Sequence, residues 1–251
     1  MARPMDEDAP RWNVPPDAFQ AQLKEVHLWR VELDVTPSRL NDWQDMLSKD
    51  EQERVRRYRF PIHRHRFIVR RSALRTILSR YLAVPAAAVK LVYGTHGKPA
   101  LSRPWNDLRF SSSHSLDLAV VAVAHGREVG VDLECVRPGM LDEEAPEEFF
   151  SAAEVLALRA LPPHRRTEGF FDCWTRKEAY VKAKGLGLSL PLDSFDVSLA
   201  PDGPAALLAT RPDPQEARRW SIHPFFVHLQ YAAALVVEGD DWQAFYWEFV
   251  A

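Results

Sequence analysis

Cysteine is scarce in this chain, and so are long apolar runs. The two cysteines, Cys135 and Cys173, are too few for a disulfide framework and belong to no Cys-x-x-Cys or Cys/His spacing typical of zinc sites. No apolar run approaches the length of a membrane span, and the first residues lack the apolar core of a signal peptide. We therefore expect a cytoplasmic protein with no membrane segment.

The composition is typical of a folded, soluble protein. Of the 251 residues, 46% are hydrophobic and 27% are charged, which suits one large domain or two small ones around a substantial core. Residues 1–23 are rich in proline and acidic side chains, and we expect them to form a loosely ordered lead-in.

Apolar periodicity predicts two successive units, residues 24–125 and 126–251, with a similar order of elements. In the first unit, strands are expected at 25–34, 89–94, 108–115 and 116–126, and helices at 40–46, 49–58 and 62–82. In the second, strands are expected at 127–136, 194–200, 218–226, 231–239 and 242–250, and helices at 151–161 and around 170–185. A turn at His125-Gly126 would pair the strand 127–136 with the strand before it. The pattern predicts a two-lobed α+β fold, with an antiparallel sheet and a long helix in each lobe.

Two carboxylates lie side by side on the predicted strand 127–136. Alternation puts Val129, Val131 and Leu133 on one face, and Asp132 and Glu134 on the other. The two acids could simply be solvated, because antiparallel sheets often have one wet face. Alternatively, they and a third carboxylate hold a cation. Oxygen ligands without His or Cys favour Mg²⁺, with Mn²⁺ as a second choice.

The predicted long helix supplies a candidate third carboxylate, Glu178. At 100° per residue, Lys177, Glu178 and Lys182 border the apolar stripe of this helix instead of lying opposite to it. The simpler interpretation is an i,i+4 ion pair between Glu178 and Lys182, worth only about 0.3–0.5 kcal/mol, with Lys177 extended over the core. The alternative places Glu178 beside the two acids of the strand. Gly185 and Gly187 are the expected end of the helix.

A strongly basic stretch forms the other charge feature. Residues 54–80 contain ten arginines and no acidic residue, and their periodic apolar residues indicate that one side of this helix packs into a core. The arginines could decorate the surface or bind nucleic acid, but the guanidinium fork suits phosphate groups and favours a polyanionic ligand. Taken alone, Lys98 is a surface residue in a turn and His114 a structural one, because neither segment has the spacing of a P-loop or a nucleophile elbow.

Four segments, in this order, strongly resemble one family: "GKPAL" (97–101), "FSSSHS" (110–115), "GVDLE" (130–134) and "WTRKEAYVKAKGLGLSLPLDSFDV" (174–197). They resemble the surfactin-type 4'-phosphopantetheinyl transferases, and the similarity extends over about residues 51–199. The resemblance implies a pseudo-twofold pair of α+β lobes with the active site between them. It also implies coenzyme A as donor substrate and an acyl or peptidyl carrier protein as acceptor. We expect a monomer that binds neither nucleic acid nor a membrane.

The resemblance also assigns residues. It implies that Glu178 and Lys182 are catalytic and that Asp132, Glu134 and Glu178 bind the metal. The implied coenzyme A-binding residues are Lys98, Ser113, His114, Asp132, Lys177 and Lys182. The family's positions for the 3'-phosphate are not matched near Glu51 and Phe67, so the expected substitutes are Arg54, Arg57, Arg66 and Arg75. Ser111 stands where the family commonly has asparagine.

The implied reaction is attack by a carrier-protein serine on the β-phosphorus of coenzyme A, with 3',5'-ADP as leaving group. Glu178 would act as base or as metal ligand. Two alternatives remain open. A Mg²⁺-dependent nuclease could use similar acids and arginines, although the hydrophobic-Glu-x-Lys strand of many nucleases is missing. A coenzyme A-binding regulatory protein could keep the same fold without catalysis.

Overall fold

The computed structural model describes residues 10–16, 22–36, 40–105, 107–137, 145–199, 204–211 and 213–250. Its helices are α1 (Leu40–Asp45), α2 (Lys49–Arg57), α3 (Pro61–Leu82), α4 (Ala145–Phe149), α5 (Ala152–Ala160) and α6 (Pro163–Lys184). The strands of its first half are β1 (Glu25–Glu32), β2 (Leu91–Tyr93), β3 (Pro99–Leu101), β4 (Leu108–Ser115), β5 (Leu118–His125) and β6 (Val129–Cys135). Those of its second half are β7 (Phe195–Val197), β8 (Leu207–Thr210), β9 (Trp220–Pro224), β10 (Tyr231–Glu238) and β11 (Gln243–Glu248).

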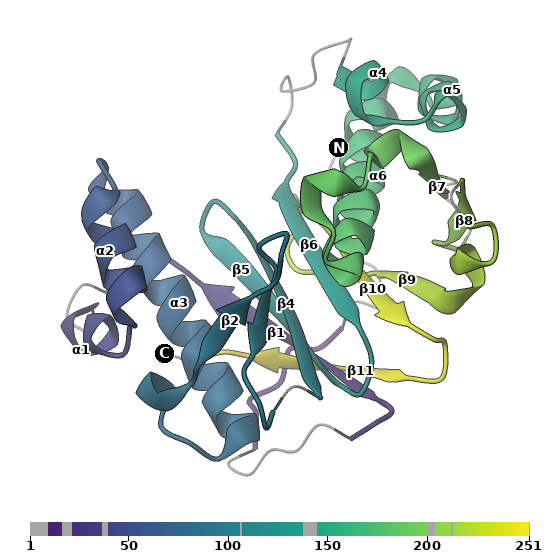
Figure 1. The fold of residues 1–251 in the computed structure, drawn as a ribbon. Coiled ribbons are helices and arrows are strands. Elements are labelled where there is room, and N and C mark those ends of the chain that lie inside the picture. The colour runs from purple at the N-terminus through teal and green to yellow at the C-terminus, as the bar shows by residue number, and fades with distance from the viewer. Residues whose placement is uncertain are drawn as a thin grey trace.

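Two main sheets form the centre of the molecule. The first has the strand order β11-β1-β5-β4 and the second β6-β10-β9, while β2-β3 and β7-β8 form two-stranded sheets. The two long helices α3 and α6 lie on opposite sides of these central strands (Figure 1). Helices and largely antiparallel sheets confirm the predicted α+β class.

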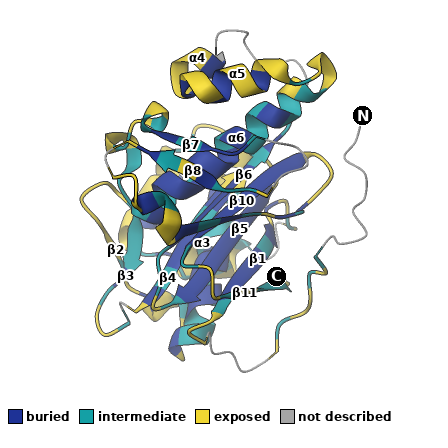
Figure 2. Cartoon of the chain, turned by 90° about the vertical axis from the view of Figure 1, so that its right-hand side faces the viewer, coloured by how far each residue is buried: buried dark blue, intermediate teal, exposed yellow. Residues whose placement is uncertain are grey.

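The two main sheets pack face to face through one apolar core, and each is covered on its outer face by a long helix. The shared core joins Val26 and Leu28 of β1 to Val131 and Leu133 of β6. The predicted alternation of the strand 127–136 is therefore confirmed. The central strands β5, β6 and β10 are buried almost throughout (Figure 2). Layers of this kind are expected because each sheet must bury both apolar faces.

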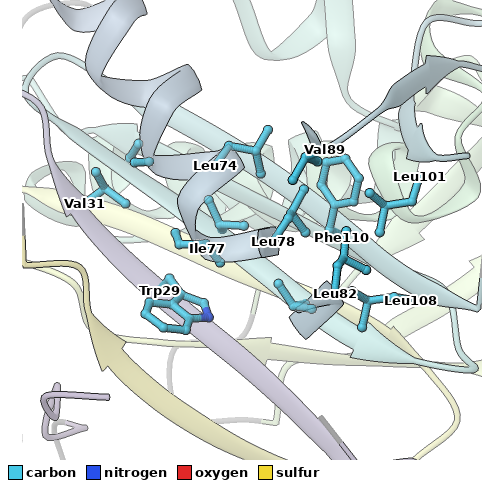
Figure 3. Packing of buried hydrophobic residues seen from close by; sticks show 14 of the residues in the cluster. Trp29, Val31, Leu74, Ile77, Leu78, Leu82, Val89, Leu101, Leu108 and Phe110 are labelled. Atoms are coloured by element: carbon cyan, nitrogen blue, oxygen red, sulfur yellow. The ribbon is translucent and has the colours of Figure 1, made fainter. Parts of the chain in front are cut away.

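A second core fills the space between α3 and the first sheet. Trp29 and Val31 of β1 point to this side, where they meet Leu74, Ile77 and neighbouring apolar residues of α3 (Figure 3). Because side chains alternate along β1, its two faces contribute residues to two different cores. Helix α3 ends at Leu82, as predicted, and the next residue, Ala83, caps it in a left-handed conformation.

A glycine lets α6 lie directly on the second sheet. A Cβ atom on Gly130 of β6 would lie 2.0 Å from the carbonyl oxygen of Ala179 and 2.4 Å from the amide nitrogen of Ala183. Any side chain there would therefore separate the helix from the strand. The helix ends at Gly185, with φ of 68°, as predicted. Gly187 instead begins a short 3-10 turn, Gly187–Ser189.

Three sequence-based expectations are wrong. Strand β6 does not pair with β5; it pairs with β10, because its apolar face closes the core between the two sheets. Strand β11, assigned to the second unit, pairs in parallel with β1 of the first sheet. Its Tyr246 and Trp247 contact the cores on either face of that sheet, so β11 covers an edge that would otherwise be open. The division at residue 125 otherwise stays a prediction.

The third concerns the lead-in. Residues 10–16 are ordered against the first sheet, where Asn13 forms a parallel bridge with Trp247. The ring of Trp12 packs edge-on against Tyr246, with centroids 5.3 Å apart, and lies beneath the guanidinium of Arg30. A loosely ordered segment would make no such contacts. Residues 1–9 and 17–21 of the predicted lead-in lie outside the described residues.

Candidate active site

Strand β4 joins the two sheets through its serines. On one face, Ser111 Oγ accepts a hydrogen bond from the amide of Val131, and Ser115 Oγ accepts one from the amide of Cys135. Ser113, between them, donates to Asp132 Oδ1 over 2.7 Å. The opposite face of β4 points toward α3. The polar segment "SSSHS" therefore forms the seam between the sheets, and Ser111 serves the fold.

A charged centre lies on this seam. Lys182 of α6 donates to Asp132 Oδ1 over 2.6 Å and to Ser113 Oγ over 2.9 Å. Asp132 is 2% exposed, and its Oδ2 has no hydrogen-bond partner among the described residues. Lys182 thus pairs with the strand acid and not with Glu178, so the simple i,i+4 interpretation is wrong.

Two further carboxylates face the same centre. Burial and the nearby Asp132 raise the pKa of Glu178, and the same two causes raise the pKa of Glu134, which accepts a hydrogen bond from Ser115 over 2.9 Å. The three acids from β6 and α6 therefore lie close enough to repel each other. Within the described part of the chain, however, no group of three or more His, Cys, Asp or Glu side chains is arranged as a ready metal cage.

A cavity of about 240 Å³ between α2, α3 and β4 is lined by three arginines and by two acids, Asp50 and Glu51. Among its lining residues are Arg54, Arg70 and Arg71. Glu51 also lines it, but ion pairs with Arg71 and with Arg75 hold this carboxylate. Arg54 and Arg70 have no carboxylate partner among the described residues, so the cavity suits an anion.

Both of these arginines pack against the ring of Phe67. The guanidinium of Arg54 lies 5.3 Å from the ring centroid, and that of Arg70 lies 5.4 Å from it. Arg70 also donates to Nδ1 of His114 over 2.9 Å. Burial, followed by the charges of Arg71 and Arg54, lowers the pKa of Arg70 to about 10.

A second, more apolar cavity of about 280 Å³ adjoins the first. The two share Gly97, Pro99 and Ser112 among their lining residues, and the second also contacts Glu178 and Lys182. The anion cavity therefore adjoins the apolar cavity, which in turn adjoins the charged centre on the seam.

Comparison with known proteins identifies the family. The model of the 4'-phosphopantetheinyl transferase superfamily matches residues 128–236, and that of a 4'-phosphopantetheinyl transferase N-terminal region matches residues 34–126. The chain is 39% identical over 240 residues to the 4'-phosphopantetheinyl transferase HetI of a Nostoc species, which covers 95% of this chain and 98% of that relative. The chain belongs to the 4'-phosphopantetheinyl transferase superfamily.

Other relatives of this transferase are more distant. Sfp of Bacillus subtilis is 31% identical over 161 residues, covering 64% of this chain and 70% of that protein. The transferase psf-1 of Bacillus pumilus is 33% identical over 181 residues, covering 72% of this chain and 76% of that protein. The family resemblance stated from the sequence motifs is confirmed. Among the described residues of the transferase, no helix is both long and apolar enough to cross a membrane.

One predicted ligand of the transferase, Lys177, is wrong. Its side chain is fully buried and donates to both carboxylate oxygens of Glu154, over 2.7 and 2.6 Å, and to the carbonyl of Phe195 over 2.7 Å. Glu154 in turn accepts from the backbone amides of Ser151 and Val197. Helix α6 is covered by protein on this side too, so the lysine faces a core and cannot reach a substrate.

The four arginines predicted to bind the 3'-phosphate also differ in whether they can reach the anion cavity. Arg75 is 3% exposed and is held by Glu51 and by the carbonyl of Val89, so its predicted coenzyme A contact is wrong. Arg66 forms a two-pronged pair with Asp34, over 2.8 and 2.7 Å, and does not line the anion cavity. Arg57 is exposed in the last turn of α2 and does not line it either. Arg54 is the sequence candidate that lines it.

The ammonium of Lys98 is also held by hydrogen bonds within the protein. It donates to Glu128 over 2.9 Å and to the carbonyls of Val129 and Ala183 over 3.3 and 3.0 Å. Lys98 still lines the apolar cavity. These contacts tie the turn before β3 to the start of β6 and the end of α6.

Sequence reasoning missed Arg70. A signal was available, because Arg70 follows Phe67 by three residues and precedes Leu74 by four, which puts all three on one face of α3. Two of them are core residues. A basic residue within an otherwise apolar face is buried beside a cavity or paired, and here it lies beside the cavity.

Proposed function

We propose that the protein transfers the 4'-phosphopantetheine arm of coenzyme A to a serine of a carrier protein, releasing 3',5'-ADP. The observation that carries this proposal is that one apolar cavity adjoins both the arginine-lined cavity and Lys182 of the charged centre. Coenzyme A has two separated anionic groups, a 3'-phosphate and a pyrophosphate, with an adenine nearby. One cavity, one apolar neighbour and one charged centre match these three parts.

The 3'-phosphate is assigned to the arginine-lined cavity. Arg54 and Arg70 supply two guanidinium groups that no described carboxylate neutralises, and His114 lies against Arg70. Charge-assisted hydrogen bonds of arginine to phosphate are strong and directional. The adenine is assigned to the adjoining apolar cavity, which leaves the pyrophosphate near Lys182 and Ser113.

The chemistry is a displacement at the β-phosphorus. The serine oxygen forms a bond to phosphorus, the bond from phosphorus to the bridging oxygen breaks, and 3',5'-ADP departs with that oxygen. Glu178 takes the serine proton; burial and Asp132 raise its pKa, which makes its carboxylate a stronger base than an exposed one. Lys182 neutralises charge on the leaving phosphate as a point charge.

The residues fit a divalent cation at Asp132 and Glu134. The buried Oδ2 of Asp132 has no partner, and carboxylate oxygens are the ligands that Mg²⁺ prefers. Because Mg²⁺ is commonly held by one or two carboxylates together with substrate phosphates, a complete protein cage is not required. Mg²⁺ or Mn²⁺, when bound, would offset the charge of the pyrophosphate oxygens. Glu178 is the remaining candidate ligand.

The proposal extends to the acceptor and to the state in which the protein acts. The acceptor is an acyl or peptidyl carrier protein, and the transferase acts on it as a cytoplasmic monomer. Size-exclusion chromatography with light scattering tests the monomer directly; a stable dimer would contradict it.

Intact-mass analysis of apo carrier proteins tests the proposal. Incubation with this protein, coenzyme A and Mg²⁺ should add the mass of one phosphopantetheine arm, and EDTA should prevent it. Tight coenzyme A binding without any mass gain across acyl and peptidyl carrier proteins would instead support the regulatory alternative.

The subsite assignment has its own test, with 3'-dephospho-coenzyme A as the comparison substrate. Loss of a hydrogen bond to a charged group costs about 1.5–3 kcal/mol, so Arg54→Met should raise the KM for coenzyme A about tenfold or more. The KM for the dephospho substrate should stay unchanged. Arg57→Met is the matched control, since Arg57 is exposed outside the cavity. Equal effects of Arg54→Met on both substrates would contradict the assignment.

A further inference from the structure

Arg70 and His114 touch in a way that determines the protonation of the histidine ring. NH1 of Arg70 lies 2.9 Å from Nδ1 of His114. A guanidinium group has only N–H donors and no acceptor, so Nδ1 must accept this hydrogen bond and cannot carry a proton. The neutral ring then carries its single proton on Nε2.

We infer that Arg70 is a positioning residue that fixes His114 as a neutral hydrogen-bond donor through Nε2–H, for a phosphate oxygen of the substrate. The inference rests on the proposed function, which places the 3'-phosphate in the cavity that Arg70 lines. A ring in the other tautomer would present a lone pair at Nε2 and would repel an anionic oxygen. Arg70 therefore acts on the substrate in two ways, by its own charge and through His114.

The surroundings of His114 keep the ring neutral as well as oriented. Partial removal from water, followed by the charges of Arg70, Lys182 and Arg54, lowers the pKa of His114 to about 4. A second proton on the ring would have to enter at Nδ1, against the N–H of Arg70. His114 therefore donates in one fixed form near neutral pH, and its Nδ1 is not available as a general base.

Arg70 is itself held firmly enough to do this. Its guanidinium packs on the ring of Phe67, and its Nε is buried without a hydrogen-bond partner in the described structure. The contacts with Phe67 and His114 hold the guanidinium in place. An unsatisfied buried N–H is costly, so this Nε–H is a donor available beside the site. Both features follow from its place on the Phe67 face of α3.

The first experiment reads the tautomer without any substrate. In long-range ¹H–¹⁵N spectra of the full chain labelled with [¹⁵N]histidine, the signals of His114 are those missing from His114→Gln. At pH 7 the wild-type ring should show the Nε2–H tautomer. A wild-type ring with Nδ1–H, or an imidazolium at this pH, would overturn the inference without any further variant.

A pair of variants isolates Arg70. Arg70→Met and Arg54→Met each remove one cavity arginine that stacks on Phe67, but only Arg70 contacts His114. The Nε2–H tautomer should persist in Arg54→Met and give way to a mixture in Arg70→Met, while Arg70→Lys, whose ammonium is also only a donor, should restore it in part. An unchanged ring in a folded Arg70→Met would overturn the inference.

Kinetics provide an independent check of the coupling. Arg70→Met should raise the KM for coenzyme A at least about threefold less in a His114→Ala background than in the wild type, because contacting residues are not additive. Equal effects in both backgrounds would show that Arg70 acts by charge alone. The spectra need no turnover, so absence of transfer to any carrier protein would contradict the proposed function and leave the tautomer result standing.

Discussion

The ammonium of Lys182 on α6 lies 2.6 Å from Oδ1 of Asp132 on β6, and 2.9 Å from Oγ of Ser113 on β4. One side chain thus joins a helix of the second unit to a strand in each main sheet. With Lys182 on Oδ1, the second oxygen of Asp132 stays buried and unpaired among the described residues.

Divalent cations should stabilise the protein through Asp132. In the presence of coenzyme A, Mg²⁺ at 100 times its Kd should add about 2.7 kcal/mol to the free energy of unfolding relative to EDTA. Asp132→Asn should abolish this difference, whereas Asp193→Asn, an exposed acid outside the site, should keep it. Thermal denaturation with and without EDTA measures the effect. An undiminished Mg²⁺ shift in Asp132→Asn would contradict the assignment.

Glu178→Gln should leave the fold intact and lower kcat by about 10²–10⁴-fold, the usual contribution of a general base. The KM for coenzyme A should change little by comparison. Time courses of carrier-protein mass measure kcat, and circular dichroism checks the fold. A folded variant with near-normal kcat would show that Glu178 does not take the serine proton.

Gly130→Ala should force α6 away from β6. The added Cβ would lie 2.0 Å from the Ala179 carbonyl oxygen, and such overpacking typically costs about 1–3 kcal/mol. Activity should fall with stability, since α6 carries Glu178 and Lys182. Urea denaturation measures the loss. In the control Gly94→Ala, the Cβ would lie 3.6 Å from the nearest atom, so a loss as large as that of Gly130→Ala would refute the explanation.

Lys177→Met should destabilise the protein by about 3–5 kcal/mol, because Glu154 would be left charged and buried. Lys184→Met on the same helix should cost less, because Glu216 keeps hydrogen bonds from Arg219 and from Nε1 of Trp220. Urea denaturation compares the two. At a temperature where Lys177→Met is folded, its KM for coenzyme A should match the wild type; a large rise would revive the substrate-binding role.

Acid should destabilise the protein partly through His114. Its folded pKa, about 4, lies below the ordinary value of 6.5, so between these values the unfolded chain binds more protons. The stability is therefore complete above pH 6.5 and is lost as the pH falls toward 4. Urea midpoints against pH should fall less steeply in His114→Gln, since other titrating groups are common to both proteins. An identical slope would contradict the lowered pKa.

Local patterns were sufficient for most elements. Helix α3 was predicted within one residue at its start, and the alternation of Val129, Val131 and Leu133 with Asp132 and Glu134 was correct, because these depend on neighbours in the chain. The partner of β6 and the place of β11 were not predictable in this way. Strand pairing depends on which apolar faces must close one core, and those faces are far apart in the sequence.

The same distinction between local pattern and tertiary packing applies to the site residues. The motifs selected Asp132, Lys182, Ser113 and His114, and the structure brings the first three together. The same motifs also selected Lys177, which neighbours Glu178 in the sequence but pairs with Glu154. If α6 had one face in solvent, Lys177 would lie on that face and be exposed. Helix α6 is covered on one side by the second sheet and on another by α5 and β7. Its charged residues therefore face two different environments: Lys182 pairs with Asp132 of β6, and Lys177 pairs with Glu154 of α5.

The amino-acid sequence alone determined the family, the α+β class and the acids and lysines from which the centre is built, since these are written in short motifs and local periodicity. Only the tertiary structure decided which arginines and lysines pair with a carboxylate of the protein and which remain available to bind an anionic ligand. Glu51 holds Arg75 and Arg71, Asp34 holds Arg66, and Glu154 holds Lys177, while Arg54 and Arg70 keep their charge beside the cavity. The physical reason is that a charged side chain takes its role from the partner within about 3 Å of it, and that partner is set by the packing of distant segments.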